Sequence, residues 1–117
     1  MQYIIGVDGG GTKTEAVAYS LNGDYIYKSV SGFGNVMVNE KEALNNIIKA
    51  IDGCIEGVYE KTKDSKCIFI CAGLAGVEAG NYSTIIKQKI EEYFKINTKV
   101  VNDAVIAHAS LLKGRME

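Results

Sequence analysis

The stretch Asp8–Thr14, which reads DGGGTKT, holds the residue types and spacing of this sequence that best suit phosphate chemistry. Glycines lack Cβ atoms, so phosphate oxygens can approach their backbone N–H groups closely. A threonine adds a hydroxyl donor and a lysine adds a cation beside the same oxygens. Asp8, at the end of the preceding apolar run, can hold Mg²⁺ through its water ligands. The candidate phosphate ligands are Gly9, Gly10, Gly11, Thr12 and Lys13.

Two phosphate loops that rely on a following helix do not fit this stretch. A Walker A loop requires a glycine directly before its lysine, whereas Thr12 separates Gly11 from Lys13. A Rossmann fingerprint requires a third glycine where Thr14 stands, and a strand-like alternation follows instead of a helix. The remaining arrangement is a hairpin with a tight glycine turn, in which Gly9–Gly11 can adopt positive φ angles.

A second carboxylate, Asp103, follows the apolar run Thr98–Val101 and Asn102. Ligands of open α/β sheets bind beyond the carboxyl ends of the strands, so Asp8 and Asp103 can face one crevice. Phosphoryl transfer to an alcohol needs positioning, charge neutralisation and one carboxylate that orients the hydroxyl and takes its proton. Asp103 is the candidate for that general base. Its position also suits a helix N-cap, and one aspartate can serve both roles.

Hydrophobic periodicity predicts a mixed five-stranded α/β sheet with helices packed on it. Short apolar or alternating runs predict three successive antiparallel strands, and helical spacing begins after Asn39, which can form a capping box with Glu42. Gly53 and Gly57 lie within this helical pattern, so we expect the helix to end before the pattern does. The expected strands are Tyr3–Asp8, Lys13–Tyr19, Asp24–Ser31, Lys66–Ala72 and Thr98–Val101. The first expected helix begins after Asn39, the second spans Ile85–Phe94, and the third follows a turn at Asn102-Asp103 and runs through Leu112.

Composition argues against two classes of partner. The 117 residues carry 13 basic and 14 acidic side chains, a net charge of -1, without a block of like charges, so nucleic acid and anionic membranes are not expected partners. The sequence has neither an apolar run of membrane-spanning length nor a signal-peptide pattern, and we expect a cytoplasmic protein. Its three cysteines, Cys54, Cys67 and Cys71, are expected to be buried core residues in a reducing compartment.

GVDGGGTKT and the hairpin after it resemble the first phosphate motif of the acetate and sugar kinase, Hsp70 and actin superfamily. The triple glycine followed by TKT is similar to the BadF/BadG/BcrA/BcrD ATPase family, which contains N-acetylglucosamine kinases. This resemblance implies a ribonuclease-H-like fold in each of two lobes, with ATP and Mg²⁺ in the cleft between them. Residues 1–117 would then form the N-terminal lobe of a longer, two-lobe protein.

Three further segments resemble the family and imply a sugar site. In SGFGNVMVN the asparagine, Asn35, would hydrogen-bond the sugar hydroxyls, although its own sequence context also suits a turn. In CAGLAGV the glycines Gly73 and Gly76 would line the sugar pocket. In VNDAVIAHAS, Asp103 would face the hydroxyl that is phosphorylated, with Asn102 beside it.

The resemblance leaves three functional hypotheses. The favoured one is ATP-dependent phosphorylation of N-acetylglucosamine or a related amino sugar. The ROK sugar kinases have a similar GGTK loop and NDA segment, but usually a single hydrophobic residue precedes their GGTK where this chain has DGGGTK. The second is a conformational ATPase that activates a 2-hydroxyacyl-CoA dehydratase, as in other members of the family. The third is that these residues are a fragment without activity of its own, whose exposed face is covered by the missing C-terminal lobe or by a second copy in a homodimer.

Overall fold

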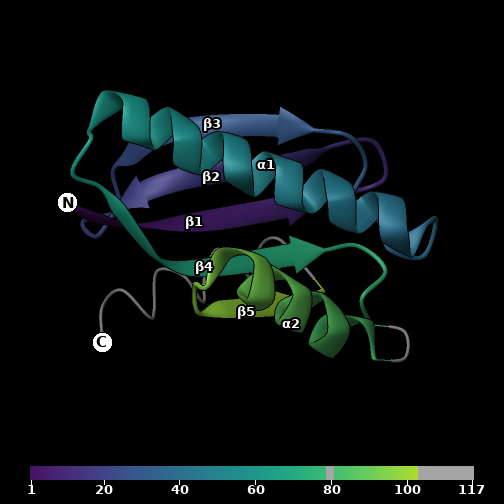
Figure 1. Cartoon of the computed structure of the whole chain (residues 1–117). Helices are drawn as coiled ribbons and strands as arrows, with labels where there is room; N and C mark the ends of the chain where they lie inside the picture. The colour runs from purple at the N-terminus through teal and green to yellow at the C-terminus, as the bar shows by residue number, and fades with distance from the viewer. Residues whose placement is uncertain (79–80, 103–117) are drawn as a thin grey trace.

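The fold is one five-stranded sheet covered on one face by two helices, in a computed structural model that describes residues 1–78 and 81–102 (Figure 1). Along the chain come β1 (Gln2–Gly9), β2 (Thr14–Ser20), β3 (Tyr25–Ser31), α1 (Glu40–Lys61), β4 (Lys66–Leu74), α2 (Tyr82–Phe94) and β5 (Thr98–Val101). The sheet order is β3-β2-β1-β4-β5. The first three strands are antiparallel, whereas β4 runs parallel to β1 and β5 parallel to β4. The predicted mixed α/β sheet is confirmed, and the third expected helix lies outside the described residues.

Alternation along the strands separates the two faces of the sheet. Tyr3, Ile5 and Val7 of β1 are buried in the main core beneath the helices, whereas Ile4 belongs to a small separate cluster and Asp8 is exposed. Because side chains alternate with period two along a strand, Ile4 and Asp8 lie on the face opposite the helices. The phosphate-loop carboxylate is therefore on the face that neither described helix covers.

The helix α1 begins at its predicted cap but continues further than predicted. The Asn39 side chain accepts a hydrogen bond from the Glu42 N–H at 2.9 Å, which satisfies one free donor of the first turn. The expectation that Gly53 and Gly57 would shorten the helix is wrong, since α1 runs to Lys61. A Cβ on Gly53 would lie 2.5 Å from the Ser29 Oγ, and one on Gly57 would lie 2.2 Å from the Tyr27 ring. These glycines allow α1 to lie close against β3.

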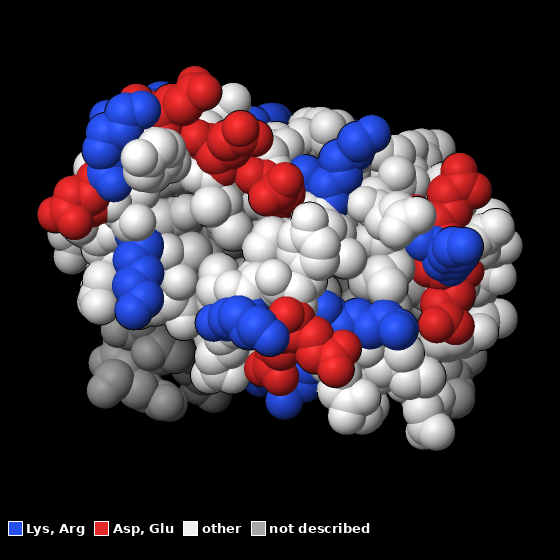
Figure 2. All heavy atoms as spheres, in the orientation of Figure 1, with Lys and Arg blue, Asp and Glu red and all other residues white. Residues whose placement is uncertain are grey.

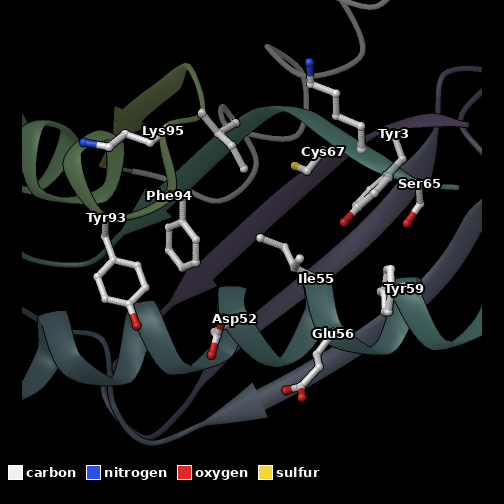
Figure 3. A pocket seen from close by; sticks show the side chains of 12 residues that line it. Tyr3, Asp52, Ile55, Glu56, Tyr59, Ser65, Cys67, Tyr93, Phe94 and Lys95 are labelled. Carbon is white, nitrogen blue, oxygen red and sulfur yellow. The ribbon is translucent and has the colours of Figure 1, made fainter. Parts of the chain in front are cut away.

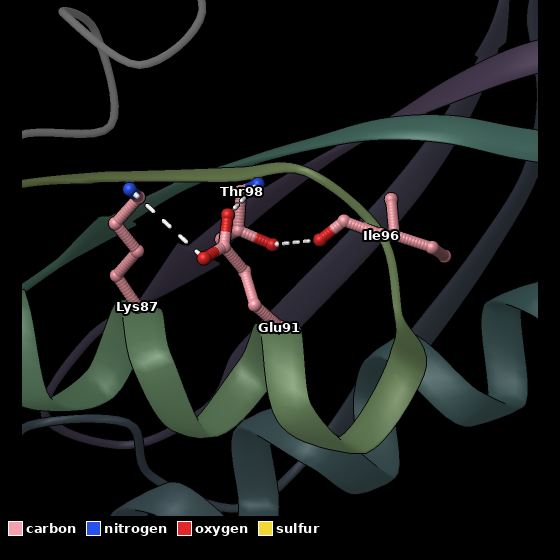
Figure 4. A network of polar contacts seen from close by, with 4 residues as sticks. All are labelled: Lys87, Glu91, Ile96 and Thr98. Carbon is pink, nitrogen blue, oxygen red and sulfur yellow. Dashed lines mark hydrogen bonds and ion pairs between the residues drawn. The ribbon is translucent and has the colours of Figure 1, made fainter.

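The helix α2 is joined to β5 by a short polar network (Figure 4). The Thr98 N–H donates to a carboxylate oxygen of Glu91 at 2.9 Å, and the Thr98 hydroxyl donates to the Ile96 carbonyl at 2.9 Å. Lys87 lies 4.0 Å from the other oxygen of Glu91. The helix ends at Lys95, its C-cap residue, which lies in the left-handed region with φ 58°. The network fixes where β5 begins, and therefore where Asn102 emerges.

The three cysteines are buried and free, as predicted. Burial raises the pKa of the Cys54 and Cys67 thiols to about 12 and also raises that of Cys71, so all three are protonated at neutral pH. None of the helices in residues 1–78 and 81–102 is both long and apolar enough to cross a membrane. Figure 2 shows acidic and basic side chains interspersed over the helix-covered face, in keeping with the near-zero net charge.

Replacing Asn39 with alanine is expected to lower the free energy of unfolding by about 1 kcal/mol, because the first turn of α1 loses its side-chain acceptor. Asn45→Ala is the matched control, since Asn45 is exposed within the same helix and its side chain makes no hydrogen bond to the described residues. The control should leave stability unchanged or raise it slightly, because alanine favours helix. Urea denaturation of both variants measures the difference, and equal losses would contradict the capping role.

Candidate functional site

Three parallel strands end at the same edge of the sheet, and each brings predicted site residues there. Asp8 of β1 pairs in register with Gly73 of β4, and Gly73 pairs with Val101 of β5. Asn102 follows directly and is exposed. The edge therefore gathers the phosphate loop, the start of the β4–α2 turn and the end of β5. Asp103, the predicted general base, lies outside the described residues.

The β1–β2 hairpin presents a row of unused backbone donors at its tip. The Gly10 N–H donates to the Lys13 carbonyl at 2.9 Å, which closes the turn. Within residues 1–78 and 81–102, the amides of Gly11, Thr12 and Lys13 have no hydrogen-bond acceptor. A Cβ on Gly11 would meet no atom within 4 Å, so the tip is open. Three successive free N–H groups next to a lysine form a donor set that suits phosphate oxygens.

The glycines of this turn do not use the positive φ angles that they can adopt. None of Gly9, Gly10 and Gly11 lies in the left-handed region; among the described glycines, only Gly23 and Gly76 do. A Cβ on Gly9 would lie 2.7 Å from the Leu74 Cδ2 and 3.3 Å from the Gly34 carbonyl oxygen, and the Gly34 side of this contact is tighter still. A Cβ on Gly34 would lie 2.8 Å from the Gly9 Cα and 2.5 Å from the Thr14 Oγ1. The loop after β3 can therefore rest directly on the hairpin.

Backbone hydrogen bonds fasten both neighbouring loops to the hairpin. The Gly34 N–H donates to the Gly10 carbonyl at 2.8 Å, and the Ala75 N–H donates to the Gly9 carbonyl at 2.8 Å. The buried Thr14 hydroxyl donates to the Gly32 carbonyl at 2.8 Å. Segments from three separate parts of the chain thus meet around the phosphate loop, with its tip left free.

Asn35 lies in the loop after β3 and packs against the loop after β4, which contains Gly76. Its side-chain oxygen accepts the Met37 N–H at 2.9 Å in a local turn, which confirms the turn that its sequence context suggested. Gly76, with φ +88°, packs so closely that a Cβ would lie 2.6 Å from this oxygen. The Asn35 amide nitrogen has no acceptor among the described residues, so it remains available to a ligand. Two residues predicted to bind sugar are therefore neighbours.

Charges at this edge are arranged around Glu15. Glu15 pairs across the strands with Asp8, so both carboxylates point to the face opposite the helices. Like charges in such a pair repel, but the Lys13 and Lys28 ammonium groups lie 3.5 Å and 3.6 Å from the Glu15 carboxylate. Asp8 itself has no ion pair within the described residues. One carboxylate is neutralised, and the other is left to attract a cation.

The described residues contain no group of three His, Cys, Asp or Glu side chains placed to hold a metal ion by themselves. A single exposed carboxylate such as Asp8 suits Mg²⁺ that is carried mainly by nucleotide phosphates and water, which is how proteins often hold this ion. The residues present therefore fit a metal bound together with a nucleotide.

Sequence reasoning missed four residues that shape this edge: Thr14, Glu15, Lys28 and Gly34. Glu15 and Lys28 become visible only when strand pairing is known, because their partners are on neighbouring strands. Gly34 carried a signal in the sequence, since it immediately precedes Asn35 between two predicted elements. Its contact with Gly9 is a tertiary feature that no local pattern shows.

Several known proteins resemble this chain in sequence. The model of the BadF/BadG/BcrA/BcrD ATPase family matches residues 5–115. An N-acetyl-D-glucosamine kinase of Dictyostelium discoideum is 31% identical over 123 aligned positions, which cover 98% of this chain and 39% of that protein. An N-acetylmuramic acid/N-acetylglucosamine kinase of Clostridium acetobutylicum is 30% identical, covering 98% of this chain and 38% of that protein. The chain therefore spans less than two fifths of the length of these relatives.

A solved structure shows the same fold. A protein of Chromobacterium violaceum, provisionally named an N-acetylglucosamine kinase, superposes with a TM-score of 0.64 at 18% identity. The superposition covers 86% of this chain and 35% of that one. At this level of identity the likeness concerns the fold alone.

Gly34→Ala is expected to lower the free energy of unfolding by roughly 1–3 kcal/mol, because the added Cβ must displace the Gly9 backbone and the Thr14 hydroxyl. Gly11→Ala is the matched control, since its Cβ enters open space and its φ is not positive. The control should change stability by less than about 0.5 kcal/mol. Thermal and urea unfolding of both variants test the contact, and equal stability of the two would contradict it.

Proposed function

The chain belongs to the BadF/BadG/BcrA/BcrD ATPase family, and from that membership we propose that the full-length protein is an ATP-dependent sugar kinase. We propose N-acetylglucosamine or a related amino sugar as the acceptor, because relatives that align with 98% of this chain are named as kinases of such sugars. The described chain would contribute the first of two lobes. The remainder of the protein would supply the second.

The observation that supports this proposal most strongly is the meeting of three loops at one edge of the sheet. The free amides of Gly11, Thr12 and Lys13 form a phosphate cradle, and the Asn35 and Gly76 loops adjoin it. A kinase must hold a phosphate donor and an acceptor hydroxyl side by side. A turn that served only to connect two strands would not require the other two loops to be fastened to it.

The residues of the hairpin would hold the nucleotide. Bound ATP, with Mg²⁺ on its phosphates, would supply the phosphoryl group that is transferred. The amides at the tip would donate to phosphate oxygens, and the Lys13 ammonium would add positive charge, which Glu15 holds in place until the nucleotide arrives. Asp8, unpaired and exposed, would orient the water ligands of the metal.

The acceptor would bind between the Asn35 loop and the end of β5. The free Asn35 amide group would donate to a sugar hydroxyl. The orientation of this side chain is fixed because its oxygen accepts the Met37 N–H. Gly73, in register with Asp8, and Gly76, packed against the Asn35 side chain, would line this part of the pocket. Asn102 and Asp103 follow β5, and Asp103 would orient the reacting hydroxyl and take its proton.

Asp103→Asn in the full-length protein is expected to lower kcat for sugar phosphorylation by at least about 10²-fold, because an amide cannot accept the hydroxyl proton. Sugar and ATP affinity should change little, since asparagine keeps the size and polarity of the side chain. Asp24→Asn, an exposed substitution in the β2–β3 turn, is the matched control. The measurement is ADP release from Mg-ATP with and without a panel of amino and neutral hexoses.

Three outcomes of that assay would contradict the proposal. Unchanged turnover in Asp103→Asn would remove this residue as the base. Slow ADP release that no sugar stimulates would replace the kinase by the conformational ATPase. Stimulation by neutral hexoses alone would overturn the choice of an amino sugar.

Gly11→Ala in the full-length protein is expected to raise KM for ATP about tenfold or more, while kcat at saturation changes less. The added methyl group would lie where phosphate oxygens approach the amides, and each obstructed hydrogen bond to a charged group is worth about 1.5–3 kcal/mol. Initial rates at varied ATP concentration measure the effect. An unchanged KM in a variant of normal stability would show that the phosphates bind elsewhere.

A further inference from the structure

A hollow lies at the end of the sheet where β1 and β4 begin. The glycine loops of the candidate functional site are at the opposite end of these two strands. The hollow has a volume of about 590 Å³ and lies between α1 and α2 (Figure 3). This volume is within the range typical of small-molecule sites. Its walls include Tyr3, Ile55, Tyr59, Cys67, Tyr93 and Phe94.

The hydroxyl of Tyr3 is the feature that indicates a ligand. Tyr3 is 1% exposed, and its hydroxyl points into the cavity between Cys67 and Ser65 (Figure 3). Among residues 1–78 and 81–102 this hydroxyl has no hydrogen-bond partner. Burial raises the pKa of Tyr3, so the group stays a neutral donor and acceptor. Buried polar groups are nearly always hydrogen-bonded, so this hydroxyl suits a partner that enters the cavity.

The cavity is bordered by aromatic rings that suit an apolar or cationic group. Tyr93 and Phe94 stand edge to face, with ring centroids 4.7 Å apart. Tyr59 already holds a cation on its ring, because the Lys63 ammonium lies 4.6 Å from the centroid. Rings of this kind attract organic ammonium groups as well as apolar surface.

Carboxylates and lysines both lie around this cavity, and the Lys63 ammonium is already on the Tyr59 ring. Asp52 and Glu56 lie one turn apart on α1 and line the cavity, and both are exposed. Neither carboxylate has an ion pair within the described part of the chain, and like charges at this spacing repel. Figure 2 shows acidic side chains gathered along α1. Lys66 and Lys95 also contribute to the wall, but the Lys95 ammonium points away from the cavity (Figure 3).

We propose that this cavity is a binding site for a small organic ammonium ion whose aromatic or branched body carries a hydroxyl or carbonyl at its other end. The body lies among the rings of Tyr59, Tyr93 and Phe94, the polar end bonds to the Tyr3 hydroxyl, and the ammonium group faces Asp52 and Glu56. The site uses none of the residues of the phosphate edge, so it does not depend on the proposed kinase function.

Calorimetric titration of the full-length protein with tyramine tests the site, because tyramine combines a phenol hydroxyl, a ring and an ammonium group. We expect saturable binding. Phenethylamine, which lacks the hydroxyl, and tyrosol, which replaces the ammonium group by a neutral hydroxyl, should each bind at least about fivefold more weakly, equivalent to roughly 1 kcal/mol. The anion 3-(4-hydroxyphenyl)propionate should bind weakest of the four. Absence of saturable binding of tyramine, or tighter binding of the anion, would overturn the proposal.

Two variants assign the contacts separately. Tyr3→Phe should make tyramine bind no better than phenethylamine, whereas Asp52→Asn combined with Glu56→Gln should make it bind no better than tyrosol. Tyr25→Phe, on the exposed side chain of β3, is the control and should bind tyramine like the parent. Without a probe, Tyr3→Phe should not lower the melting temperature, since the lost hydroxyl has no partner. A lower melting temperature, or unchanged discrimination in both variants, would overturn the proposal.

Discussion

The approach of the Gly9 and Gly34 backbones is the constraint on which the candidate site depends. A Cβ at position 34 would lie 2.8 Å from the Gly9 Cα, so no other residue type fits there without movement of the main chain. The approach brings the Gly34 N–H to the Gly10 carbonyl and places Asn35 beside Gly76. Two loops are held by main-chain contacts rather than by long side chains. The hairpin tip therefore keeps its own amides free while its surroundings are fixed.

Within residues 1–78 and 81–102, the helices cover one face of the sheet and the charged residues of the site lie on the other. Both described helices pack on the side of Tyr3, Ile5 and Val7, and Gly53 and Gly57 let α1 lie close to β3. Asp8 and Glu15 are on the opposite side, where they pair with each other across neighbouring strands. Glu15 draws Lys13 and Lys28 toward this face, so positive charge lies beside the free carboxylate. The alternation of side chains that buries the apolar residues on one face therefore also places the charged residues of the candidate site on the other.

The succession of strands and helices along the chain and the helix cap could be predicted from the sequence because both depend on local patterns. Alternation, the asparagine at position 39 and the apolar runs are short-range signals, and Thr98–Val101 begins and ends as predicted. The glycines were misjudged for the opposite reason. Gly53 and Gly57 were expected to shorten a helix, and positive φ angles were considered for Gly9–Gly11. The roles of Gly53, Gly57 and Gly9 are instead set by contacts with Ser29, Tyr27 and the Gly34 loop from distant parts of the chain. Glu15 was missed because its role depends on Asp8 and Lys28, which are brought beside it only by strand pairing.

The two candidate ligand sites can be occupied together because β1 separates them in two ways. Tyr3 and Asp8 are on the same strand but at opposite ends of it, and their positions differ by an odd number, so their side chains point to opposite faces. Between them, β1 pairs along its whole length with β2 on one side and β4 on the other. A ligand at Tyr3 would contact the helix side of this central strand, and a nucleotide would contact its carboxyl end. Neither needs to displace the other, so any influence between them must pass through the sheet.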